Sequence, residues 1–473
     1  MKEDNPNRPE GWRAAAAADE RWPAAHTRGR LGLVLFWAVF ALAVWLRWQI
    51  RGPAISSDEC ALVGPPGRGS IGFFNNIEWA RNSPLFPFVF SFIPNFAVAL
   101  QWGRDAATIS GLAAVAAVYL AARRATGGDA LSGALASAIV AFDPVLAYES
   151  VTFRPYGIWA LVESWRLACL CGLLAESSDT IRPHVWNRFV VLTCLLPWTH
   201  YASFAILAFE AVLFAILLPA RRWVLKAHAI AAVTALPLIA FVVYMRNSPD
   251  PTGGALGRAI EIAFARHVGG HGWRWIFPFL AFVLAIVLSG STAARAVLTH
   301  WLAIGAAALL LSATTLVRPA VTALGVPAFA IAVPTAISVL RGRARYVGLA
   351  AASLLVFANW PFAHLPPRDY GPAREAADIA AFASDLRRES HRGTWNVFPD
   401  WNFMVLNVDL HMNGAHVEVP APDLMQVGEA RLRPFRDLTK PPPGHVIIFS
   451  CNDQLAGCTA TGGRSCAKTY ECP

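Results

Sequence analysis

Two adjacent carboxylates, Asp58 and Glu59, stand directly after the first long apolar stretch of the chain. Carboxylates beside a membrane can bind a divalent cation or remove a proton as a general base. Acidic residues are also ordinary on protein surfaces, where they only carry charge. The pair therefore gains weight only if other polar groups lie at the same face of the membrane.

A second group of charges comprises Asp143, at the end of a later apolar stretch, and Glu149 and Arg154, a few residues further on. Charges at membrane depth are costly, and those that occur tend to serve function. The alternative is an ion pair between Glu149 and Arg154 that caps two helix ends. In either case we expect these residues at the same membrane boundary as Asp58.

Three more residues could contact an anion at this boundary. His200 and Tyr201 interrupt an apolar stretch, which leaves His200 recessed on the outer side, although a lone histidine more often makes a structural hydrogen bond. Arg318 is a single cation between two apolar segments, and a guanidinium can grip a phosphate bidentately. The alternative for Arg318 is that its side chain extends to the outer lipid head groups.

The elements that must position these residues are helices in a membrane. The 473 residues are 55% hydrophobic and 15% charged, whereas soluble domains carry about 25% charged residues. A spanning helix needs roughly 20 mostly apolar residues, and such stretches recur from Leu31 to Pro361. The net charge of +9 comes mostly from arginines in short clusters between them, which is typical of orientation signals. We therefore expect a lipid bilayer around the chain and no nucleic-acid partner.

The arginine clusters also set the predicted topology. If all twelve apolar stretches between 31 and 361 spanned the membrane, three clusters would face outward, namely 123–124, 221–222 and 341–345. The stretch at 84–101 contains Pro87 and Pro94, which suits a juxtamembrane helix along the outer interface better than a span. Eleven spans then remain, with the N-terminus inside, the C-terminus outside and large external loops at 51–104 and 245–273.

The chain divides into a cytoplasmic tail over 1–30, a transmembrane module over 31–361 and an external domain over 362–473. The last region is polar, with a helical pattern over 373–389 and an apolar stretch at 446–449, so we expect a small α/β domain. Four of the eight cysteines lie there without the close pairs of a zinc site, which favours disulfides formed outside the cytoplasm. The predicted fold class is an all-α polytopic membrane protein with this domain at its end.

Taken in order, the acidic pair and four later segments resemble the GT-C superfamily of lipid-linked-sugar glycosyltransferases, in the bacterial glycosyltransferase 39-like branch of protein O-mannosyltransferases and aminoarabinose transferases. The four segments are Asn82 to Phe88, Arg154-Pro155-Tyr156, Thr199-His200-Tyr201, and Arg318 with the later Pro327. Each motif is weak alone, and the series, which covers residues 31 to about 361, is what is specific. The C-terminal domain with its four cysteines matches no subfamily pattern.

The resemblance implies transfer of a hexose or pentose from a polyprenyl-phosphate carrier to a glycan, lipid or protein acceptor. The reaction would occur at the outer face of a bacterial inner membrane. It implies that Asp58 takes the proton of the acceptor hydroxyl, with Glu59 as the substitute base.

The leaving group would be a lipid phosphate, whose growing charge needs compensation. The resemblance assigns the donor phosphate to Arg318, Arg154, His200 and Tyr201. It also implies a divalent cation, Mg²⁺ or Mn²⁺, held by Asp58 with Glu149 or Asp143.

The alternative function is a transporter or flippase of lipid-linked or anionic substrates. It predicts polar residues through the middle of several spans and paired repeats. The polar residues considered above gather at the outer boundary and no repeat is visible, so the sequence favours the enzyme.

Overall fold

The structure of the chain is a computed structural model. It describes residues 24–51, 59, 85–90, 93, 96–175, 182–217, 222–239, 292–313, 324–338, 340, 342–358, 371–388, 392–398, 405–406, 410, 417–421, 424–435, 437–449, 454–464 and 466–473. Of the predicted site residues, Asp58 and Arg318 lie outside these ranges, as does the external loop expected at 245–273.

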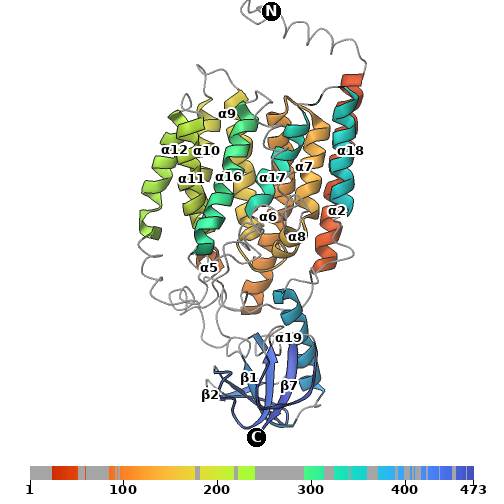
Figure 1. The fold of residues 1–473 in the computed structure, drawn as a ribbon, viewed down its shortest axis with the longest axis vertical. Coiled ribbons are helices and arrows are strands. Elements are labelled where there is room, and N and C mark those ends of the chain that lie inside the picture. Colours follow the sequence, from red (N-terminus) through yellow and green to blue (C-terminus); the bar gives the residue numbers. More distant parts are fainter. Residues whose placement is uncertain are drawn as a thin grey trace, which may run out of the picture.

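The described elements before residue 371 are helices, and the longer ones run side by side in one bundle (Figure 1). They are α2 (Ala24–Ile50), α5 (Leu85–Phe90), α6 (Phe96–Ala125), α7 (Ala130–Phe142), α8 (Pro144–Glu149), α9 (Tyr156–Ala175), α10 (Pro183–Thr199), α11 (Ala202–Leu217), α12 (Arg222–Thr234), α16 (Thr292–Ala313), α17 (Val326–Ile337) and α18 (Arg343–Ala358).

Three segments of the described helices are long and apolar enough to cross a membrane: Gly29–Ile50, Val98–Ala125 and Tyr156–Leu174. Shorter apolar helices, α7, α11 and α17, lie in the same bundle. The chain is therefore an integral membrane protein with a mostly helical fold. The total of eleven spans stays a prediction.

The segment at 84–101 differs from the single juxtamembrane helix that its prolines suggested. The helix α5 covers only Leu85–Phe90, and residues 96–101 form the first turns of the 30-residue helix α6. A proline at 94 cannot donate a backbone hydrogen bond, which favours a new helix start just after it. The single helix expected over 84–101 is thus divided, and its position along the outer interface stays a prediction.

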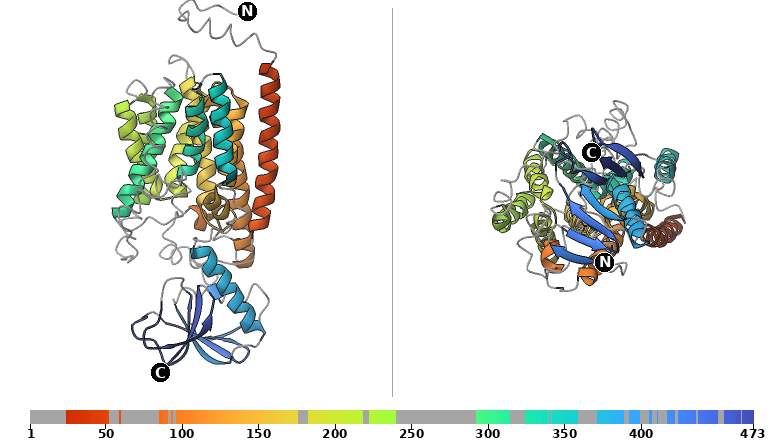
Figure 2. Two further views of the ribbon diagram at one scale, coloured as in Figure 1. Left: turned by 45° about the vertical axis from the view of Figure 1, so that its right-hand side comes forward. Right: turned by 90° about the horizontal axis from the view of Figure 1, so that it is seen from below.

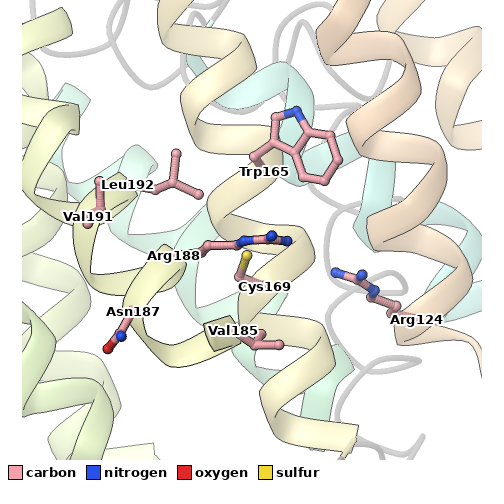
Figure 3. Close-up of a pocket in the computed structure, with 8 residues that line it drawn as sticks. All are labelled: Arg124, Trp165, Cys169, Val185, Asn187, Arg188, Val191 and Leu192. Atoms are coloured by element: carbon pink, nitrogen blue, oxygen red, sulfur yellow. The ribbon is translucent and has the colours of Figure 1, made fainter. Parts of the chain in front are cut away.

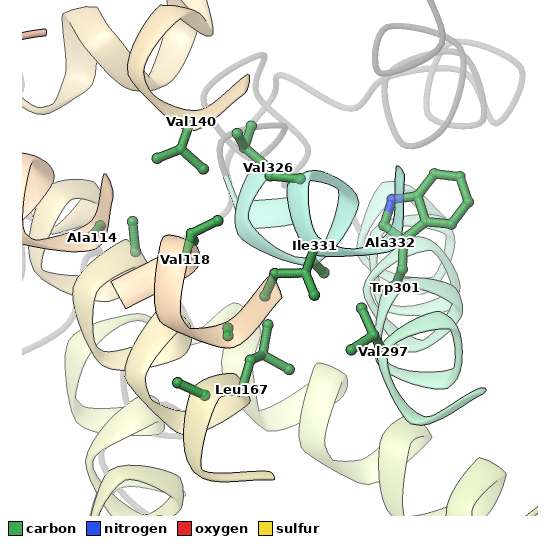
Figure 4. Close-up of a cluster of buried hydrophobic side chains, with 14 of the residues drawn as sticks. Ala114, Val118, Val140, Leu167, Val297, Trp301, Val326, Ile331 and Ala332 are labelled. Atoms are coloured by element: carbon green, nitrogen blue, oxygen red, sulfur yellow. The ribbon is translucent and has the colours of Figure 1, made fainter. Parts of the chain in front are cut away.

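Small side chains let the central helices approach closely. A Cβ atom added to Gly157 of α9 would lie 2.5 Å from the carbonyl oxygen of Ala107 in α6, so only glycine fits this contact. Such close approach is the usual means of packing helices in lipid, where no hydrophobic force draws them together. Figure 4 shows the resulting core, in which Val118 of α6, Leu167 of α9 and Ile331 of α17 meet.

The two ends of the bundle make different contacts. At one end, Arg345 in the first turn of α18 pairs with Asp129 in the turn between α6 and α7, with 2.6 Å between Nη2 and Oδ2. At the other end, Leu100 of α6 belongs to an apolar cluster shared with the C-terminal domain. Figures 1 and 2 show this domain below the bundle and the start of α2 at the opposite end.

The C-terminal domain is a seven-stranded sheet with one helix, α19 (Gly371–Arg387), packed against it. The strand order is β2-β3-β4-β1-β5-β7-β6. The strands are β1 (Gly393–Phe398), β2 (Glu418–Ala421), β3 (Leu424–Val427), β4 (Ala430–Pro434), β5 (Gly444–Phe449), β6 (Thr459–Gly463) and β7 (Ala467–Cys472). The strand β1 pairs in parallel with β4 and β5, and the other pairs are antiparallel. The predicted small α/β domain is confirmed.

The apolar stretch at 446–449 forms most of β5, where each of these residues is buried. The helix α19 covers the sheet with Phe382, whose ring lies 5.6 Å from that of Phe449. Cys458 and Cys472 form a disulfide, and Cys466 is also disulfide-bonded. The cysteine spacing therefore correctly indicated disulfides rather than a zinc site for these three residues.

One apolar cluster joins the domain to the bundle. It contains Phe153, from the segment before α9, together with Val405, Leu406 and Leu410 from the segment between β1 and β2. The same cluster continues to the buried face of α19 and the sheet. The domain therefore packs on the end of the bundle at which residues 149–154 lie.

Candidate functional site

Glu59 occupies a buried polar cluster at the end of the bundle that faces the C-terminal domain. Its carboxylate accepts hydrogen bonds from Nε of Arg104 at 2.8 Å and from Nη2 of the same side chain at 2.9 Å. It also accepts the backbone N–H of Phe153 at 2.7 Å. Glu59 is fully buried. Three donors, two of them from a cation, fix the chain at residue 59 against α6 and the segment before α9.

Two glycines make room for that segment. A Cβ atom on Gly103 would lie 2.0 Å from the ring of Phe153, and one on Gly111 would lie 2.5 Å from Cβ of Ser150. The ring of Phe90 in α5 packs edge-on against Phe153, with 5.1 Å between centroids. The backbone N–H that binds Glu59 is therefore positioned from two helices, α5 and α6.

Glu149 and Arg154 form the ion pair that the sequence left as an alternative. Nη1 of Arg154 donates to both carboxylate oxygens of Glu149, at 2.9 and 3.1 Å, and both residues are buried. Tyr148 lies among the same charges, and its burial, followed by the nearby carboxylate of Glu59, raises the pKa of its hydroxyl above the usual value. That hydroxyl is therefore protonated and can donate a hydrogen bond.

Asp143 lies at the junction of α7 and α8. Its Oδ1 accepts the backbone N–H of Leu146 at 2.7 Å, so the carboxylate caps α8. Nε of the buried Arg47 donates to Oγ of Ser150 at 3.0 Å, and its Nη1 donates to the carbonyl of Ala141 at 3.2 Å. These contacts attach α2 to the turn that carries Glu149.

The carboxylates expected to bind a divalent cation are thus engaged with protein groups. Glu149 receives Arg154 on both oxygens, and Asp143 caps a helix. Within the described ranges there is no group of three or more His, Cys, Asp or Glu side chains that could hold a metal ion. Asp58, the third expected ligand, lies outside those ranges, so the Mg²⁺ or Mn²⁺ site stays a prediction.

His200 and Tyr201 lie at the break between α10 and α11, as the sequence indicated. Nδ1 of His200 accepts the backbone N–H of Ala202 at 3.1 Å, and its ring lies 5.2 Å from that of Tyr156. Nε1 of Trp159 donates to Oγ of Ser203 at 2.7 Å. Two of the predicted motifs, one around Arg154 and one around His200, therefore meet through Tyr156.

Arg104, the partner of Glu59, was not predicted from the sequence. A cluster of buried ionisable side chains inside the bundle was not predicted either, and it corrects the expectation that polar residues gather at the outer boundary. The cluster comprises Glu163 and Arg166 on α9, Glu210 on α11, His228 on α12 and His300 on α16. The signal was present, since two opposite charges three residues apart interrupt an apolar stretch.

Short contacts connect all five side chains. Arg166 contacts Glu163 and Glu210, each at 3.0 Å. His300 contacts Glu163 at 2.6 Å, and His228 contacts Glu210 at 3.1 Å. Opposite charges thus balance one another in the lipid-embedded core, and the cluster joins four helices.

No family model and no curated protein matches the sequence. Among solved structures, the chain is similar to ArnT from Cupriavidus metallidurans in the apo state, with a TM-score of 0.51 and 12% identity over 93% of this chain and 97% of that one. ArnT bound to undecaprenyl phosphate gives a TM-score of 0.48 and 16% identity, over 80% and 75% of the chains. The Archaeoglobus fulgidus oligosaccharyltransferase in complex with Zn and sulfate gives 0.43 and 12%, over 79% and 61%.

At these identities the likeness concerns the fold, and the apo ArnT structure carries it over nearly the full length of both chains. The comparison agrees with the resemblance that the ordered motifs indicated, although overall sequence identity alone would not reveal it. The chain is an integral membrane protein with the fold of ArnT from Cupriavidus metallidurans.

Proposed function

We propose that the protein transfers a sugar from a polyprenyl-phosphate carrier to an acceptor hydroxyl at the outer face of a bacterial inner membrane. The observation that carries this proposal is the set of hydrogen bonds to Glu59, the neighbour of Asp58 in the sequence, at the end of an ArnT-like bundle next to the C-terminal domain. The ArnT structure with undecaprenyl phosphate supports a lipid-phosphate donor as the substrate class.

In this mechanism Asp58 is the general base. It takes the proton of the acceptor hydroxyl while the oxygen attacks the anomeric carbon of the sugar, and the carbon–phosphate oxygen bond breaks. Glu59 was the substitute base of the sequence analysis, but its carboxylate is already bound by Arg104 and Phe153. We propose that Glu59 acts as a positioning residue for Asp58.

The leaving lipid phosphate gains charge, which nearby cations stabilise. We assign this role to Arg318 and to Arg154, with His200 and Tyr201 beside the same end of α9. Arg154 contacts Glu149 through Nη1. A bound phosphate would therefore share the Arg154 guanidinium with the Glu149 carboxylate. Glu149 and Asp143 already accept hydrogen bonds from protein groups. The mechanism proposed here therefore uses no divalent cation.

The topology proposed with this function has eleven spans, a cytoplasmic N-terminus and an external C-terminal domain. The arginines of the Asp129–Arg345 end then face the cytoplasm, as the orientation rule requires. The domain lies over the Glu59 site through the Phe153 cluster. It is therefore placed to shape the access of a glycan, lipid or protein acceptor.

The cluster around Arg166 is an observation in favour of the transporter or flippase, because charges inside spans often mark translocation paths. Glu163, Arg166, Glu210 and His300 are, however, fully buried and contact one another. A path for a substrate needs groups that it can reach. The glycosyltransferase therefore remains the function that the structure supports best.

The test is sugar transfer by the purified protein in lipid nanodiscs from synthetic polyprenyl phosphates that carry a hexose or a pentose. We expect Asp58→Asn to lower the rate about 100-fold or more, as loss of a general base does. Asp437→Asn, at an exposed turn of the C-terminal domain, is the matched control and should keep full activity. Unchanged transfer by Asp58→Asn would remove Asp58 as the base, and no transfer with any donor would overturn the proposed reaction.

A further inference from the structure

A cavity of about 460 Å³ lies between α6, α9 and α10, near the end of the bundle away from the C-terminal domain. Its walls are Arg124, Trp165, Cys169, Val185, Asn187, Arg188, Val191 and Leu192. None of these described lining residues is acidic. Figure 3 shows the side chains of Arg124 and Arg188 extending toward each other from different helices.

The two arginines come from different helices and lie at a similar height along the bundle. Arg124 stands next to the last residue of α6, and its Nη1 donates to the carbonyl of Ala168 at 2.7 Å, which attaches its head to α9. Arg188 lies on the second turn of α10 and is exposed. Each guanidinium has several N–H donors, so the bond of Arg124 to Ala168 leaves others for a ligand.

The cavity lies about as far from the helix ends as a lipid head group would. Cys169 stands six residues before the end of α9, and Arg188 five residues after the start of α10, which is about 8–9 Å from either helix end at 1.5 Å per residue. Further toward the bilayer centre the wall is apolar and exposed, with Trp165 at 36% and Val191 at 56%. The arginines lie near the helix ends and the apolar wall lies deeper in the bundle. A phospholipid has the same order, with its phosphate at the surface and its acyl chains inside.

We propose that this cavity binds an anionic phospholipid of the cytoplasmic leaflet. Its phosphate lies between Arg124 and Arg188, where guanidinium groups form charge-assisted bidentate bonds. One acyl chain follows the wall of Trp165, Val191 and Leu192. The inference uses the proposed orientation of the chain in the membrane and is independent of the sugar-transfer reaction.

The experiment measures lipid binding by native mass spectrometry of the full-length protein in detergent. The wild type is titrated with phosphatidylglycerol, with phosphatidylethanolamine, with undecaprenyl phosphate and with inorganic phosphate. The test variant is Arg124→Gln/Arg188→Gln. The control, Arg123→Gln/Arg343→Gln, removes the same charge at the same end of the bundle, where Arg123 contacts the carbonyl of Gly128 instead.

We expect the wild type to retain phosphatidylglycerol in preference to phosphatidylethanolamine, and the test variant to bind it about tenfold more weakly or worse. The control should bind as the wild type does. Thermal unfolding without added lipid shows whether the test variant is folded. If it is not, the single variants Arg124→Gln and Arg188→Gln are measured instead.

Three outcomes would overturn the proposal. These are equal phosphatidylglycerol binding by wild type and test variant, an equal loss in the control, and displacement of the lipid by inorganic phosphate. Stronger arginine-dependent binding of undecaprenyl phosphate would assign the cavity to the donor carrier instead. None of these outcomes bears on whether Asp58 is the base.

Discussion

Arg104 holds Glu59 by two parallel hydrogen bonds, at 2.8 and 2.9 Å, across 45 residues of sequence. The two residues come from separate parts of the chain, since Glu59 precedes α5 and Arg104 lies on the third turn of α6. The pair attaches the chain at residue 59 to α6. We therefore expect it to position Asp58, the proposed base, which is the neighbour of Glu59 in the sequence.

The first prediction concerns this pair. Glu59→Gln should destabilise the protein by about 3–5 kcal/mol, because it leaves the buried cation of Arg104 without its carboxylate. Unfolding in detergent by heat or denaturant measures the loss. Arg392→Gln is the control, since its ion pair with Glu429 is exposed (80% and 64%) and is worth about 1 kcal/mol or less. A loss no larger than that of the control would contradict the clamp.

The second prediction concerns the space beneath Phe153. Gly103→Ala should cost about 1–3 kcal/mol and lower sugar transfer, because its Cβ would enter the ring of Phe153 and shift the N–H that binds Glu59. The double variant Gly103→Ala/Phe153→Leu should regain part of the lost stability and part of the lost sugar transfer. Gly172→Ala, where the nearest atom would be 3.7 Å away, is the control and should be neutral or stabilising. If the two alanine variants behave alike, the close contact is not there.

The third prediction concerns the charge cluster inside the bundle. Arg166→Gln leaves the carboxylates of Glu163 and Glu210 buried with less compensation, so we expect a loss of at least about 3–5 kcal/mol. Size-exclusion chromatography after graded heating in detergent measures it. Arg222→Gln, at the exposed start of α12, should leave the profile unchanged. A stable Arg166→Gln protein that has lost activity would instead reassign the cluster to a functional path.

The fourth prediction is a dependence on pH at the Asp129 turn. Burial raises the pKa of Asp129, but the hydrogen bond from Ser132 and the attraction of Arg345 outweigh it, so the pKa lies below 3.8. A lowered folded-state pKa gives stability that is present above about pH 4 and is lost as the pH falls through the folded-state value. Asp129→Asn should therefore be less stable than the wild type near pH 7, and the difference should shrink below pH 4. Parallel melting curves from pH 3 to 8 test this, and a constant difference would contradict it.

Much of the architecture could be predicted from local patterns. Runs of apolar residues gave the helices, and the cluster Val446 to Phe449 marked the central strand β5, because such patterns need no knowledge of distant contacts. The break at His200 and the helix end at Asp143 followed from polar residues in apolar surroundings. The single helix expected over 84–101 was wrong because the prolines at 87 and 94 look alike in sequence, while only the second comes just before a long helix.

The site was harder to predict because its pairs are distant in sequence. Glu59 with Arg104, Arg47 with Ser150 and Arg166 with His300 each join residues that no local motif connects. The Glu149–Arg154 pair, separated by five residues, was foreseen as an alternative for that reason. Long-range partners need the packing of helices, which sequence spacing does not contain.

The apolar cluster that contains Phe153, Leu406 and Leu410 also sets the order in which the molecule matures. Glu59 leaves the ribosome early, whereas the residues of the sheet domain leave it last. The segment that donates its N–H to Glu59 is thus not enclosed until the sheet domain has been synthesised. A chain that lacks this domain therefore also lacks the finished surroundings of Glu59.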